Sequence, residues 1–125
     1  MTPTIWKITA LAALFGLVFI LGYGLNRAGK PYPLAAFTVH KLAALGILVW
    51  LIRQAVVTQR AAPLSALQWA GVGLAAGCFV LAMATGGLVS TDRPAPLWAA
   101  RVHALIPYLT LLVSGGAFAL LGALR

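Results

Sequence analysis

Residues 30–40 read KPYPLAAFTVH, and residues 93–103 read RPAPLWAARVH. Both prolines, the leucine after the second of them and the closing histidine recur at one spacing, and His40 and His103 are the two histidines of the chain. This recurrence predicts two copies of one unit, over about residues 5–55 and 66–124, each carrying one imidazole. We interpret two symmetry-related imidazoles as holding one ligand between them.

Composition places the chain in a lipid bilayer. Hydrophobic residues make up 62% of it and charged residues 8%, whereas a soluble domain carries about 25% charged residues. Four apolar stretches, over about residues 5–25, 36–53, 66–89 and 97–124, are each close to the length that spans a bilayer. The linkers are short, so neighbouring helices must be antiparallel. We therefore predict an all-α fold: one membrane domain over residues 1–125, a transmembrane antiparallel four-helix bundle of two repeated helical hairpins.

The first apolar stretch has a second interpretation, a cleaved signal peptide with residues 1–7 as its basic segment. We favour a membrane span, because the stretch is long enough to cross, no small-x-small cleavage site follows it, and the repeat needs it. Cys78, the single cysteine, lies within a span and has no intrachain disulfide partner.

The basic residues flank the spans and give a formal net charge of +8. They form no run with interleaved aromatic residues, so we expect no nucleic-acid partner.

The basic residues also bear on orientation in the membrane. We expect Lys7, Arg53, Arg60 and Arg125 on one side of the membrane, and Arg27, Lys30, Lys41, Arg93 and Arg101 on the other. The bare count slightly favours histidines on the cytoplasmic side. If anions of a bound cofactor neutralise part of the histidine-side set, the balance reverses, and we expect cytoplasmic termini in a bacterial or archaeal plasma membrane.

The Pro-x-Pro-Leu element predicts where the second and fourth spans begin. Proline fixes its own φ and disfavours helix in the residue before it, so each helix should start just after Pro33 or Pro96. Each histidine then lies about 10 Å further along the helix axis, at 1.5 Å per residue. That depth is inside the hydrocarbon.

An ionisable side chain within a span predicts a functional site, and imidazole is a common metal ligand. Structural zinc takes four protein ligands, whereas haem iron needs two beyond its porphyrin. We therefore predict one haem b with His40 and His103 as its iron ligands. Lys41 and Arg101 are expected to pair with the haem propionates, helped by Arg27, Lys30 and Arg93.

With these residues the chain resembles the membrane b-type cytochromes, including the cytochrome b561 type, in which antiparallel helices hold haem between histidines on facing spans. The resemblance covers the four-span layout and the two histidines with their basic neighbours. It implies electron transfer rather than catalysis, with redox proteins or a larger membrane complex as partners beside the lipid. Cytochromes of the b561 type usually carry two haems, and this chain has no histidine pair at the second membrane face.

Three alternatives stay open at this point. A chlorophyll-type pigment would need only one histidine per magnesium, and a small structural subunit of a larger complex would need no cofactor. A proton-coupled transporter would need a carboxylate in the membrane, and none of the expected spans contains one.

A flat cofactor would need small residues beside it. Near the histidine end of the first and third spans the sequence has Gly22, Gly24, Thr85, Gly86 and Gly87. Pro107 could position His103, and Thr38, Tyr23 or Tyr108 could hydrogen-bond an imidazole or a propionate.

Overall fold

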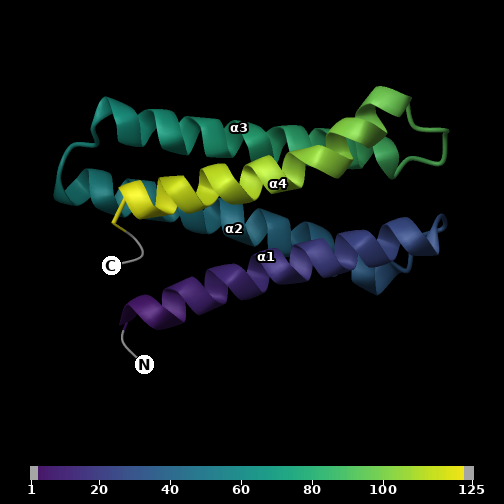
Figure 1. Cartoon of the computed structure of the whole chain (residues 1–125), viewed down its shortest axis with the longest axis horizontal. Coiled ribbons are helices and arrows are strands. Elements are labelled where there is room, and N and C mark those ends of the chain that lie inside the picture. Colours follow the sequence, from purple (N-terminus) through teal and green to yellow (C-terminus); the bar gives the residue numbers. More distant parts are fainter. Residues whose placement is uncertain (1–2, 123–125) are drawn as a thin grey trace.

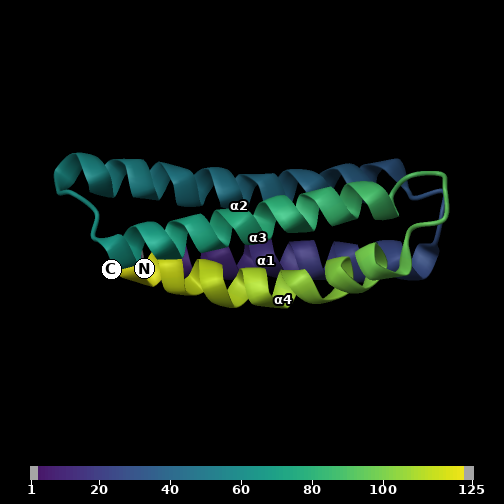
Figure 2. The same cartoon turned by 90° about the horizontal axis from the view of Figure 1, so that it is seen from above.

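The computed structural model describes residues 3–122, which form four α-helices: α1 (Pro3–Ala28), α2 (Leu34–Ala61), α3 (Ala66–Val89) and α4 (Leu97–Leu120). The helices run up and down in one bundle, with the α1–α2 and α3–α4 loops at one end and the α2–α3 loop at the other (Figures 1 and 2). Each helix is long and apolar enough to cross a membrane. The predicted all-α bundle is therefore confirmed, while the internal repeat stays a prediction.

The ends of the helices follow from local sequence. Helices α2 and α4 begin directly after Pro33 and Pro96, as the Pro-x-Pro element predicts. Gly29 ends α1 with φ at +68°, a left-handed conformation that glycine adopts without steric cost. Ser65 starts α3 through a capping box with Gln68, which satisfies two backbone N–H groups at the helix start.

Helix α2 is longer than we expected, since it continues to Ala61 rather than ending near residue 53. Residues 53–61 are more polar, but they contain no proline or glycine, and the next proline is Pro63. Hydropathy marks where the membrane core ends, and a helix continues beyond that point until a breaker stops it. The expected fourth span reached residue 124; its last residues and Arg125 lie outside the described residues.

The packed core occupies the half of the bundle near the α2–α3 loop. Trp50 and Phe118 meet edge to face there, with ring centroids 5.4 Å apart, and Leu51 and Ala75 are fully buried. Phe15, Ile47 and Phe79 belong to this core. These three side chains also line a cavity, so close packing ends where the cavity begins.

Candidate functional site

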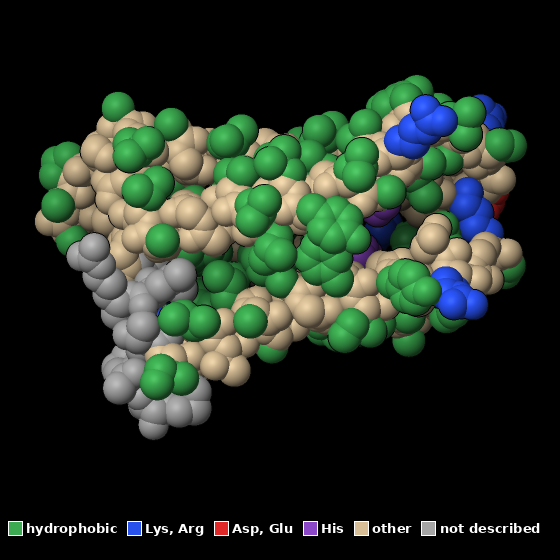
Figure 3. Space-filling model, viewed as in Figure 1, with side chains coloured by type: hydrophobic (Ala, Val, Ile, Leu, Met, Phe, Trp, Pro, Cys, Tyr) green, Lys and Arg blue, Asp and Glu red, His purple; other side chains and the backbone are tan. Residues whose placement is uncertain are grey.

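A cavity of about 600 Å³ lies in the half of the bundle that carries the histidines, and all four helices line it. Both His40 and His103 line it, together with Gly22 and Gly86 from the two preceding helices. The space-filling view shows the histidine side chains at the bottom of a hollow (Figure 3). The structure therefore brings the two predicted ligands to one cavity.

The backbone of α1 fixes the ring of His40. Its Nδ1 lies 3.0 Å from the carbonyl oxygen of Val18. A carbonyl can only accept, so Nδ1 carries the proton and donates it. In a neutral imidazole the lone pair then belongs to Nε2, the nitrogen that remains available for a ligand.

His103 has the same arrangement against α3. Its Nδ1 donates to the carbonyl oxygen of Ala82 at 3.0 Å, and Thr85 Oγ1 lies 3.3 Å from the same nitrogen. Thr85 is 1% exposed, and its hydroxyl donates to the carbonyl of Leu81 at 2.7 Å. With its proton used in this way, the hydroxyl offers a lone pair to the Nδ1–H of His103.

Glycines of α1 and α3 make room for the two rings. A Cβ at Gly22 would lie 3.0 Å from His40 Cε1, and a Cβ at Gly86 would lie 2.7 Å from His103 Cε1. Gly22 and Gly86 each follow the accepting carbonyl by four residues, which places them on the same helix face. A side chain at either position would displace the imidazole from its carbonyl partner.

Gly24 and Gly87, which align in the repeated sequence, have no atom near their Cβ positions. The pair in contact with the rings is instead Gly22 and Gly86, because one residue more separates glycine from histidine in the first hairpin. Two of the small residues near the histidines, Gly22 and Gly86, are thus in contact with the imidazole rings, and the expectation that the set makes room for a flat cofactor stays a prediction.

Of the five predicted propionate partners, only Lys41 lines the cavity. Its Nζ lies 4.0 Å from the centroid of the Phe37 ring, within the range of a cation–π contact. Arg101 and Arg93 are exposed side chains that do not line it. The structure thus places the cation of the first hairpin, but not that of the second, at the cavity wall.

Two further cations, which do not line the cavity, have hydrogen-bond partners of their own. Arg27 donates to the hydroxyl of Tyr23 at 3.3 Å, one turn back on α1. Lys30 donates across the end of the bundle to the carbonyl oxygens of Thr91 and Arg93. The role of the whole cation set in binding propionates stays a prediction.

The partners of the imidazoles were not visible in the sequence. Tyr23, Tyr108 and Pro107 line the cavity, whereas Thr38 is exposed and does not. The groups bonded to the rings are backbone carbonyls of α1 and α3, which any residue would supply. The sequence did indicate Thr85, because this residue precedes Gly86 at the histidine end of its span. Its contact with His103 could not be predicted, because that contact depends on how α3 packs on α4.

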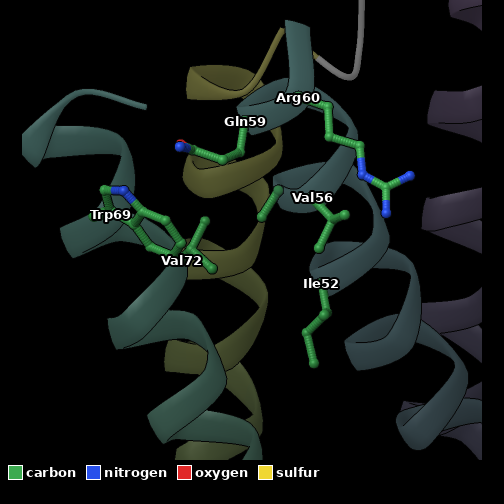
Figure 4. A pocket seen from close by; sticks show the side chains of 7 residues that line it. Ile52, Val56, Gln59, Arg60, Trp69 and Val72 are labelled. Atoms are coloured by element: carbon green, nitrogen blue, oxygen red, sulfur yellow. The ribbon is translucent and has the colours of Figure 1, made fainter. Parts of the chain in front are cut away.

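A second pocket of about 390 Å³ lies at the opposite end of the bundle, between α2 and α3 (Figure 4). Gln59 lines it but already accepts a hydrogen bond from the backbone N–H of Leu64 at 2.8 Å. Arg60 extends on the side of α2 away from Trp69 (Figure 4). This pocket brings together no set of groups that suggests chemistry.

The histidine cavity offers two imidazoles, and Met83, Tyr23 and Tyr108 also line it. Within residues 3–122, no group of three His, Cys, Asp or Glu side chains could hold a metal ion. Two imidazoles with available Nε2 atoms suit a metal that brings its remaining ligands with it. Comparison of the chain with protein-family models, with curated proteins and with solved structures finds no match.

Proposed function

We propose that this protein is a membrane b-type cytochrome that holds one haem b between His40 and His103 and transfers electrons. The observation that carries the proposal is the shared seating of the two rings. Both histidines line the same cavity, and each donates its Nδ1–H to a backbone carbonyl of the preceding helix at 3.0 Å. Metal-bound histidines almost always donate their other ring N–H in this way, because the bond fixes the tautomer and the ring orientation.

The size and lining of the cavity support a flat apolar cofactor. Its volume of about 600 Å³ lies within the range of small-molecule and cofactor sites, which are mostly apolar with a few polar groups. Phe15, Phe19 and Phe79 line it beside the imidazoles. A tetrapyrrole would find apolar walls for its ring, and His40 and His103 would hold its metal.

Charge supports haem among the tetrapyrroles. The chain has one acidic residue, Asp92, against nine lysines and arginines, and Asp92 lies in the α3–α4 loop. Propionates would supply anions at the end of the bundle where Lys41 lines the cavity. A buried carboxylate without such a cation would be costly.

Electron transfer is the reaction that these residues favour. Haem held by His40 and His103 would supply one-electron redox chemistry. The protein's part is to hold both rings in one tautomer, to keep water away with the aromatic wall, and to set the potential through the groups around the rings.

The test is the optical spectrum of the protein purified from cells supplied with iron and a haem precursor. We expect a sharp low-spin spectrum on dithionite reduction and one haem b per chain by extraction. A protein that folds but contains no tetrapyrrole would contradict the proposal and favour a structural subunit. Extraction of a magnesium tetrapyrrole would favour the pigment-binding alternative.

A further inference from the structure

The helices around the histidine cavity pack against one another to different extents. Helix α1 packs on α2, and α3 packs on α4, whereas the contact between α1 and α4 is slight. In the space-filling view the histidines are seen through an opening between these two helices (Figures 1 and 3). We call this opening the α1–α4 seam and define it by Phe19 of α1 and Tyr108 of α4.

Phe19 and Tyr108 form the aromatic pair that bridges the seam. Their ring centroids lie 5.2 Å apart, both residues line the cavity, and Tyr108 is 60% exposed. Such a pair contributes about 0.5–1.5 kcal/mol beyond the area that it buries. Opening the seam would have to break this contact, and Phe19 also packs against the core.

The loop end of the cavity is bridged by polar contacts. Lys30, in the α1–α2 loop, donates to the backbone carbonyls of Thr91 and Arg93 in or beside the α3–α4 loop. Hydrogen bonds from an ammonium group are stronger than those between neutral groups. The two hairpins are thus tied together where they meet water and are nearly separate where α1 faces α4.

The seam faces hydrocarbon. Large apolar side chains cover the outer surfaces of its helices, with Ile20 of α1 72% exposed and Leu105 and Leu112 of α4 70% and 73% exposed. We infer that the cofactor enters sideways from the bilayer, through the α1–α4 seam, with Phe19 and Tyr108 closing behind it. This inference rests on the proposed function.

The entering ligand would be a flat macrocycle with carboxylates on one edge, dissolved in the bilayer with those carboxylates near the headgroups. Such a molecule already has the orientation that the cavity requires. Its metal centre would lie at the depth of the histidines, and its charged edge would lie toward Lys41 and the loops. Entry through the seam therefore needs translation but no inversion, and no carboxylate crosses hydrocarbon.

A reversible cross-link across the seam tests this route. In a Cys78→Ala background, Phe19→Cys with Tyr108→Cys would be joined by a short reducible bifunctional thiol reagent. The control joins Gly71→Cys to Ala117→Cys with the same reagent. A Cβ at Gly71 would lie 3.8 Å from that of Ala117, so the two positions are close together, and this pair links α3 to α4 away from the seam.

The readout is the rate at which apoprotein in phosphatidylcholine vesicles takes up haemin, followed by the rise of the low-spin absorbance. The seam cross-link should slow uptake by about tenfold or more, equal to about 1.4 kcal/mol in the barrier, and reduction of the linker should restore the rate. The control cross-link should leave it unchanged. Equal rates with the seam joined or free would overturn the inference, as would equal slowing by both cross-links.

A second variant keeps the test decisive if the paired cysteines prevent folding. Phe19→Ala with Tyr108→Ala removes the bridging rings, and haemin uptake should become about three- to tenfold faster, the range expected for an aromatic pair. Uptake no faster than in the unmodified protein would overturn the inference. If the unmodified protein binds no haemin at all, the proposed function fails, and the seam inference fails with it.

Discussion

The two hairpins hold their histidines by the same contacts but surround them differently. In α1–α2 and in α3–α4 alike, Nδ1 donates to a carbonyl one helix back at 3.0 Å, and a glycine lies against the ring. Only His103 has a hydroxyl beside Nδ1, that of Thr85. The residue that precedes the contacting glycine in the first hairpin is Leu21.

The cations differ as well. Lys41, the neighbour of His40, lines the cavity, while Arg101, two residues before His103, does not. The repeated segment fixes where each helix begins and how deep its histidine lies, because proline sets both through the backbone. The surroundings of each ring depend on the adjoining helix, where the repeat is weaker, so similar motifs give two unequal halves of one site.

The largest expected effect is the loss of either imidazole. His40→Ala and His103→Ala should each lower haem content at least about tenfold and abolish the low-spin spectrum, because each would remove one of the two ligands of the proposed haem. Haem extraction and the reduced spectrum measure both. If one variant keeps a wild-type spectrum, the two hairpins are not equivalent as ligand donors. If both keep it, the ligand assignment is wrong.

The next effect should come from the glycines, and it should be unequal. Gly86→Ala places a Cβ 2.7 Å from the ring of His103, and Gly22→Ala places one 3.0 Å from that of His40. Overpacking costs about 1–3 kcal/mol, so haem affinity should fall about five- to hundredfold, more for Gly86 than for Gly22. Haem titration of the apoproteins measures both losses.

Gly87→Ala and Gly24→Ala are matched controls for that prediction, since nothing lies within 4 Å of either added Cβ. They should keep wild-type affinity and make their helices slightly more stable, because alanine has the higher helix propensity. A loss at Gly24 or Gly87 as large as at Gly22 or Gly86 would mean that the glycines contact something other than the imidazoles.

Much of the fold was predictable from the sequence because membrane spans are long and apolar and because proline acts locally. The starts of α2 and α4 at Leu34 and Leu97 follow from the preceding prolines. The end of α2 at Ala61 was missed, because hydropathy reports the edge of the bilayer rather than the end of a helix.

The site was predictable to a smaller extent. A histidine pair within spans indicates a ligand, but the acceptors on Val18 and Ala82 are backbone carbonyls, and no side-chain pattern marks them. Whether Lys41 or Arg101 lines the cavity depends on the rotation of each helix about its axis. Residue type and spacing set that rotation only loosely in a chain whose helices are apolar on every side.

The two cations should therefore differ in their effect on the midpoint potential. Lys41→Gln should lower the potential, because a cation near the site favours the electron-rich state, by an amount within the range of about 0.2–1 kcal/mol for exposed charge pairs. Arg101→Gln should have less effect, and Arg53→Gln, on the later part of α2, should have none. Redox titration at low salt measures the series. An equal effect of Lys41 and Arg101 would show that both reach the propionates.

The smallest expected effect concerns the hydroxyl that distinguishes the two rings. Thr85→Val removes the acceptor 3.3 Å from His103 Nδ1 but keeps the shape of the side chain and leaves the Ala82 carbonyl in place. A hydrogen bond from Nδ1–H makes a ligating imidazole more basic and favours oxidised iron. Its loss should raise the midpoint potential, by less than Lys41→Gln lowers it, because Nδ1–H keeps its bond to the Ala82 carbonyl. Thr85→Ser keeps the hydroxyl and should behave as wild type, which separates the bond from the packing of the γ-methyl group. Leu21→Thr places a hydroxyl one residue before Gly22, at the matching position beside His40, and should lower the potential. Equal shifts in Thr85→Val and Thr85→Ser would assign the difference between the two hairpins to packing rather than to this hydrogen bond.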